Sequence, residues 1–154
     1  MGTYYIDLQF ADLSLQGGVP PEEKITQWVE TVLAPRRDEA ELSIRIVDNA
    51  EIQSLNKQFR HQDKPTNVLS FPADLPEGLD IPLLGDVVIA APVVEAEAIE
   101  QGKAIEAHWC HMVVHGVLHL LGYDHIDENE AIVMESLETG ILTGLGYEDP
   151  YETG

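Results

Sequence analysis

The chain has 154 residues, 44% of them hydrophobic and 23% charged, which is enough for one ordinary domain with an apolar core. Its net charge of −20, from 28 acidic and 8 basic residues, argues against a general nucleic-acid-binding surface, because phosphate contacts need lysine and arginine. No segment reaches the ~18 apolar residues of a membrane span. The first residues lack a signal-peptide pattern and the single cysteine, Cys110, excludes an internal disulfide, so we expect a cytoplasmic protein.

The first half of the chain predicts two strands that alternate with two helices. Residues 4–10 and 41–48 alternate apolar and polar side chains, which is typical of half-buried strands. Residues 22–33 follow two prolines and carry an apolar stripe at helical spacing, and a second helix begins at Asn49, which we expect to be its cap. The side chains expected to face a core are Ile25, Trp28, Val29, Val32, Leu33, Leu42, Ile44, Ile46, Ile52, Leu55 and Phe59.

The second half predicts two short strands and then helices only. The strands lie at residues 67–71 and 85–90, on either side of a loop rich in proline and glycine. A helix over residues 92–102 has proline at its first position, and a mostly apolar helix follows over residues 104–121. This second helix stops at Gly122, which predicts a left-handed C-terminal cap.

The last helix begins at Asp127, which forms a capping-box-like pattern with Glu130. Its apolar stripe consists of Ile132, Leu137, Ile141 and Leu142. No repeat or linker divides the chain. The order of elements therefore predicts one α+β domain over residues 1–154, with a central helix rich in histidine.

Three histidines, His115, His119 and His125, form the most informative pattern. The first two lie one turn apart on one helical face, and Gly122 lets the chain turn so that His125 can approach them. Three imidazoles with an open fourth position are typical of a catalytic zinc site, whereas a structural site would need a fourth ligand. Cys110 points away on the helix, and we expect His111 to make a hydrogen bond behind the metal ligands rather than bind the metal.

Zinc proteases with this histidine spacing carry a catalytic glutamate directly after the first histidine, where this chain has Gly116. A phosphodiester can be cleaved largely by charge stabilisation from a metal ion and an arginine. The segment from Ile52 to Pro72 holds three basic residues and one acidic residue, in an otherwise acidic chain. Within it, Arg60 is the candidate for phosphate binding, and Lys57 and Lys64 are candidates for guiding the strand.

Two blocks of the sequence resemble the YbeY family of bacterial endoribonucleases. The first is HGVLHLLGYDH, residues 115–125, and the second is LNKQFRHQDKPTNVLSFP, residues 55–72. The segments GDVVIA and LGYEDPY also fit in the expected order, so the resemblance covers nearly the whole chain. One departure is Asn67, where the family usually has aspartate; the change removes a charge that could position water, or alters only a turn.

The resemblance implies a small, mixed, mainly parallel β-sheet packed with about five helices. It also implies one zinc ion held by His115, His119 and His125, with Arg60 as the important arginine. The implied activity is single-strand-specific, metal-dependent endoribonuclease cleavage in 16S ribosomal RNA 3′-end maturation and ribosome quality control. The implied partners are single-stranded RNA, ribosomal RNA and ribosomal proteins.

Two other interpretations stay open on the sequence. A zinc metallopeptidase-like hydrolase is disfavoured by Gly116, which supplies no base. A non-catalytic ribosome-assembly factor with a structural zinc fits the acidic net charge, because acidic surfaces attract basic ribosomal proteins. Metal-dependent cleavage of RNA, or of a protein substrate, separates these interpretations.

Overall fold

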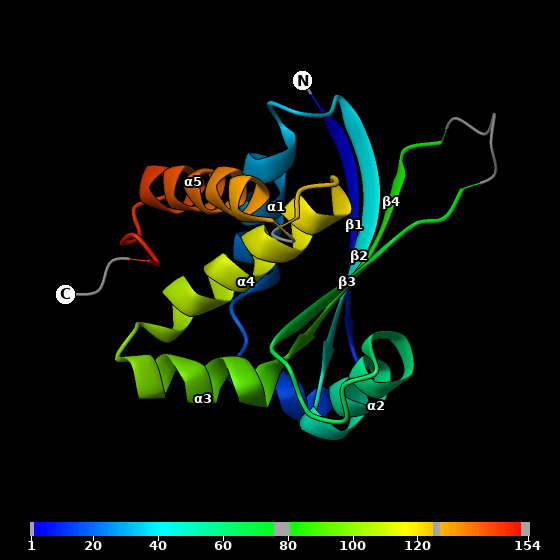
Figure 1. The fold of residues 1–154 in the computed structure, drawn as a ribbon, viewed down its shortest axis with the longest axis vertical. Coiled ribbons are helices and arrows are strands. Elements are labelled where there is room, and N and C mark those ends of the chain that lie inside the picture. The colour runs from blue at the N-terminus through cyan, green and yellow to red at the C-terminus, as the bar shows by residue number, and fades with distance from the viewer. Residues whose placement is uncertain (1, 76–80, 125–126, 152–154) are drawn as a thin grey trace.

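The computed structural model describes residues 2–75, 81–124 and 127–151, which form one β-sheet with helices on both faces (Figure 1). The strands are β1 (Thr3–Phe10), β2 (Glu39–Val47), β3 (Val68–Pro72) and β4 (Leu83–Ala90). The helices are α1 (Glu22–Leu33), α2 (Asn49–Arg60), α3 (Ala91–Gln101), α4 (Ile105–Leu120) and α5 (Glu128–Gly144), with a 3₁₀ helix, η1, at Leu13–Gly18. All four predicted strands and all five predicted helices are confirmed, whereas η1 was not predicted.

The sheet has the strand order β1-β2-β4-β3. Strands β1, β2 and β4 are parallel to one another, and β3 pairs antiparallel with β4. This arrangement confirms the α+β fold with a mixed, mainly parallel sheet. It also leaves β3 at an edge of the sheet within the described part of the chain.

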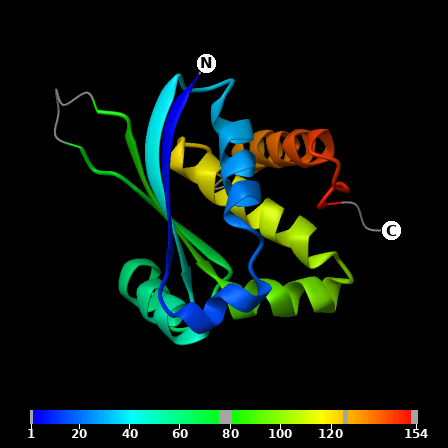
Figure 2. The same ribbon diagram turned by 180° about the vertical axis from the view of Figure 1, so that it is seen from behind.

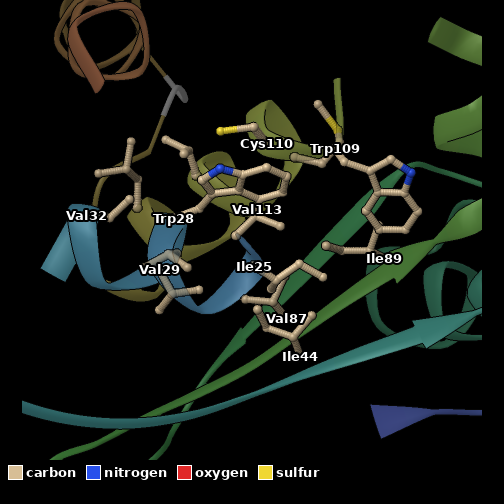
Figure 3. Close-up of a cluster of buried hydrophobic side chains, with 14 of the residues drawn as sticks. Ile25, Trp28, Val29, Val32, Ile44, Val87, Ile89, Trp109, Cys110 and Val113 are labelled. Carbon is tan, nitrogen blue, oxygen red and sulfur yellow. The ribbon is translucent and has the colours of Figure 1, made fainter. Parts of the chain in front are cut away.

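The two faces of the sheet carry separate apolar cores. Helices α1 and α4 cover one face, whereas α2 lies on the other, as both views show (Figures 1 and 2). The larger core joins α1 and α4 to the inward side chains of β2 and β4 (Figure 3). The smaller core joins α2 to β2, β3 and β4 through residues that include Ile52, Leu69 and Val88. Alternation along β4 explains the division, because Val87 and Ile89 face α4 while Val88 faces α2.

Two local predictions about α2 and α5 need correction. The cap of α2 is Asp48 rather than Asn49, because the Asp48 side chain accepts the backbone N–H of Glu51 at 2.9 Å. Phe59 and Ile132 were predicted to face the core, but their exposed fractions are 51% and 55%. Both lie at the margin of an apolar stripe, where periodicity does not define how far the neighbouring element extends.

The start of α5 and the end of α4 agree with the sequence patterns. Asp127 caps α5 by accepting the backbone N–H of Glu130 at 2.8 Å, as predicted. Gly122 follows α4 with a positive φ of 103°, a conformation that glycine adopts readily. In the described part of the chain, no helix is both long enough and apolar enough to cross a membrane.

Candidate functional site

Helix α4 crosses the sheet at the centre of the molecule and carries a row of histidines. His111, His115 and His119 follow one another at helical i, i+4 spacing, so they lie along one face. Cys110 lies on the opposite side, fully buried in the larger core (Figure 3). Burial, followed by the charge of Glu106, raises the pKa of the Cys110 thiol to about 12. Cys110 is therefore a core residue directed away from the histidines, as its position in the helix predicts.

Gly116 is required by the packing of α4 on the sheet. A Cβ atom at this position would lie 2.5 Å from Val87 Cγ1 and 3.4 Å from Val68 Cγ2. The backbone oxygen of Gly116 also accepts a hydrogen bond of 2.9 Å from the buried Ser70 hydroxyl of β3. The position where zinc proteases have their glutamate is thus turned toward the sheet and has no room for any side chain.

A pocket of about 450 Å³ lies where the C-terminal end of α4 meets the edge strand β3. The rings of His115 and His119 have centroids 4.6 Å apart and line one side of it. Arg60, the last residue of α2, lines it as well and donates from Nη2 to the backbone oxygen of Ser70 at 3.2 Å. The other lining residues are Thr66, Asn67, Val68, Leu69, Ser70 and Asp124. The fold therefore brings together two predicted metal ligands and the predicted phosphate-binding arginine from distant parts of the sequence.

The two predicted guiding lysines lie outside this pocket lining. The Lys57 ammonium lies 3.9 Å from the Asp63 carboxylate, and both side chains are mostly exposed. Lys64 is also exposed, in the loop between α2 and β3. Of the three basic residues in this segment, Arg60 therefore lines the pocket, whereas the two lysines are exposed outside it.

Glu138 of α5 lies behind the histidine row and was missed by sequence reasoning. Its side chain is fully buried, and its two oxygens contact two histidines: Oε1 lies 2.5 Å from His115 Nδ1, and Oε2 lies 2.9 Å from His111 Nε2. The Tyr151 hydroxyl also donates to Oε2. Burial by itself would raise the pKa of Glu138, but the contacts with His111 and His115 hold that pKa below its usual range.

One sequence signal could have identified Glu138. It stands four residues after Met134 and four before Leu142, and all three are buried on one face of α5. A carboxylate in the middle of an apolar stripe is costly unless it has partners, so its presence there predicts a buried contact. His111 contacts Glu138 and does not line the pocket, so the hydrogen bond expected of His111 is present, whereas its place behind metal ligands stays a prediction.

Asn67 has a defined role at the start of β3. Its Oδ1 accepts the backbone N–H of Val68 at 2.7 Å, and its Nδ2 donates to Glu97 Oε1 at 3.1 Å. Glu97 also contacts His108 Nε2 at 3.0 Å. Because the partner of Asn67 is itself a carboxylate, an amide makes a hydrogen bond here that an aspartate could not make.

The donor set fits a divalent metal in part. His115 and His119 present two imidazoles in one pocket, and a carboxylate holds His115 from behind in the way that commonly orients a metal-binding histidine. Asp124 Oδ1 lies 3.9 Å from His119 Nδ1. Among residues 2–75, 81–124 and 127–151, no three ligand side chains are grouped so as to hold a metal ion. The third predicted ligand, His125, lies outside those ranges.

Comparison with known proteins identifies the family. Residues 15–146 match the sequence model of the family described as endoribonuclease YbeY, and this range includes the pocket and the histidine row. The chain belongs to the YbeY family. A relative from Cellvibrio japonicus, named endoribonuclease YbeY, is 56% identical over 153 residues, which cover 99% of this chain and 85% of the relative.

The fold of this YbeY-family chain also matches a solved structure. A Thermotoga maritima protein whose structure was determined in solution aligns with a TM-score of 0.58 and 25% identity. The match covers 96% of this chain and 99% of that protein. The family resemblance inferred from the histidine and arginine blocks is confirmed, and so is the fold that it implied.

Proposed function

We propose that this YbeY-family chain is a metal-dependent endoribonuclease specific for single-stranded RNA. The observation that carries the proposal is the pocket in which His115 and His119 of α4 meet Arg60 of α2 at the edge of β3. A cation site beside an arginine suits a phosphodiester, whose transition state gains negative charge on its phosphoryl oxygens. The name of the Cellvibrio japonicus relative, endoribonuclease YbeY, supports RNA as the substrate.

Arg60 is well placed to bind phosphate. Its guanidinium offers five N–H donors, and the backbone oxygen of Ser70 holds it by Nη2 against the edge strand. Within the described part of the chain, no carboxylate lies within ion-pair distance of Arg60. Among the described residues its positive charge is available to an anionic ligand, and the planar fork can bind two oxygens of one phosphate.

In this proposal His115, His119 and His125 hold the metal, for which zinc is the ion that suits three imidazoles. The bound ion would act as a Lewis acid toward the scissile phosphate. The protein's own part is to orient His115 through Glu138 and to place Arg60 on the same phosphate. Gly116 lies against the sheet and supplies no side chain to this pocket, which disfavours a peptidase of the glutamate-dependent kind.

The resemblance to the YbeY family also implies the substrate and the cellular process in which this activity would take part. The substrate would be ribosomal RNA, with cleavage contributing to 16S 3′-end maturation and to ribosome quality control in the cytoplasm. Contacts with ribosomal proteins are supported by the net charge of −20, since those partners are basic. Lys57, one turn before Arg60 on α2, and Lys64, in the exposed loop that follows this helix, would guide the strand toward the pocket.

The experiment compares RNA cleavage by zinc-loaded wild type, His115→Ala and Arg60→Ala, with Arg37→Ala as a matched control. Arg37 is an exposed arginine after the end of α1, outside the pocket lining. Cleavage of an end-labelled single-stranded RNA should fall at least about 100-fold in the His115 and Arg60 variants and stay unchanged in the control. Equal cleavage by all four proteins refutes the proposal, and ribosome binding without cleavage by the wild type favours a non-catalytic assembly factor.

A further inference from the structure

We propose that Glu138 is a positioning residue that fixes His115 for metal binding through Nε2 and keeps His111 out of the metal site. The proposal rests on the metal site put forward above. Glu138 lies on α5, the helix that follows the histidine motif in the sequence.

Glu138 is fully buried on the face of α5 that packs against α4. Removing a carboxylate from water costs several kcal/mol, and apolar side chains at the same position usually stabilise a fold as well or better. Its neighbours on this face, Met134 and Leu142, are apolar and buried. A charge retained among them indicates a requirement other than helix packing.

The contacts of Glu138 show what that requirement is. Oε1 lies 2.5 Å from His115 Nδ1, so the carboxylate can accept that N–H and set the rotation of the ring. With Nδ1 engaged, a metal held by His115 would be bound through the opposite nitrogen, Nε2. Oε2 is held by His111 Nε2 at 2.9 Å and by the Tyr151 hydroxyl, which fix the carboxylate in this orientation.

The same contacts distinguish His111 from His115, although both lie on one face of α4. The Nε2 atom of His111 is used by Glu138, and its Nδ1 is buried without a hydrogen-bond partner among the described residues. Of the two, only His115 lines the pocket that also contains Arg60. The structure thus assigns His115 to the metal and His111 to the support of Glu138.

The first test measures zinc affinity by competition with a chromophoric chelator. Glu138→Gln should weaken zinc binding about 10–100-fold, as expected for loss of a carboxylate behind a ligating histidine. Glu100→Gln is the control, because it removes the same charge from an exposed position on α3, outside the cavities that His115 lines, and should change the affinity less than about 2-fold. An unchanged zinc affinity in folded Glu138→Gln overturns the proposal, whereas a wild type that binds no zinc overturns the metal site itself.

The second test observes the ring of His115 directly and does not depend on the stability of a Glu138 variant. In the zinc-loaded wild type, nitrogen-15 NMR of the histidine rings should show His115 bound through Nε2 with a proton on Nδ1. His111 should show no metal-induced shift at either nitrogen. Metal on Nδ1 of His115, or on either nitrogen of His111, would be incompatible with the assignment. If Glu138→Gln fails to fold, Tyr151→Phe replaces it, since it removes one contact to Oε2 and should weaken zinc binding by a smaller factor.

Discussion

Replacing Gly116 by alanine tests whether packing, rather than chemistry, accounts for the missing protease glutamate. The added Cβ would lie 2.5 Å from Val87 Cγ1 and 3.3 Å from Val87 Cγ2. Optimal carbon contacts are about 3.5–4.0 Å, so α4 or β4 must shift by roughly 1 Å. Val87 is fully buried in the central part of the sheet and has a stiff, branched side chain, so it cannot rotate away easily.

Two opposing contributions determine how Gly116→Ala changes the free energy of unfolding. Overpacking of a core typically costs about 1–3 kcal/mol, whereas alanine stabilises a helix interior relative to glycine by about 0.5–1 kcal/mol. We therefore expect Gly116→Ala to lower the free energy of unfolding by about 1–2 kcal/mol. Gly116→Glu should prevent stable folding, because it places a longer, charged side chain between helix and sheet.

The assay is equilibrium urea unfolding followed by circular dichroism, with Gly140→Ala as the matched control. Gly140 lies inside α5, is exposed, and has nothing within 4 Å of the position that a Cβ would occupy. It should therefore show the helix-propensity gain alone, about 0.5–1 kcal/mol of added stability. A Gly116→Ala protein that is stabilised as much as Gly140→Ala would refute the packing argument. A Gly116→Ala, Val87→Ala double mutant should show a favourable coupling of at least about 0.5 kcal/mol.

Three further results are expected, two from contacts and burial in the structure and one from the proposed metal site. Asn67→Asp should lower stability at pH 8 by roughly 1–2 kcal/mol in urea unfolding, because it replaces the hydrogen bond to Glu97 by repulsion between two carboxylates. The loss should shrink toward pH 4, where protonation of one carboxyl removes the repulsion, and an equal loss at both pH values would contradict this cause. Cys110, whose pKa is raised to about 12, should not react with a disulfide reagent at pH 8 until the protein is unfolded; rapid reaction of the native protein would show that the thiol is accessible. Chelation should abolish cleavage of single-stranded RNA and added zinc should restore it, whereas undiminished activity after verified metal removal would exclude a metal-dependent mechanism.

Much of the fold could be predicted because its patterns are local. The apolar stripe of α1 and the alternation of β2 each lie within a dozen residues, and all the side chains assigned to their buried faces are buried. Caps and turns are also local, as Asp127 and Gly122 show. The wrong predictions concern the ends of elements. The N-cap of α2 is Asp48, one residue before the predicted Asn49, and Phe59, at the end of the apolar stripe of α2, is exposed.

The candidate site was predicted in part for the same reason. His115 and His119 stand one helical turn apart, so a single window of sequence places them together. Arg60 was singled out by local charge and by family resemblance, but its meeting with the histidines depends on β3 pairing antiparallel with β4. Lys57 and Lys64 belong to the same basic segment, yet they lie on the surface outside the pocket, because Lys57 is drawn toward Asp63 and Lys64 lies in an exposed loop.

By itself, the sequence determined the elements, the family and the residue types available for chemistry, because periodicity and motif spacing are properties of short segments. Only the tertiary structure shows why position 116 is a glycine: α4 packs so closely on Val87 that a Cβ atom has no room there. Only the tertiary structure shows, too, that Glu138 of α5 contacts His115 Nδ1. Both facts depend on which helix faces pack together, and that is set by strand order and crossing geometry, which no local window encodes.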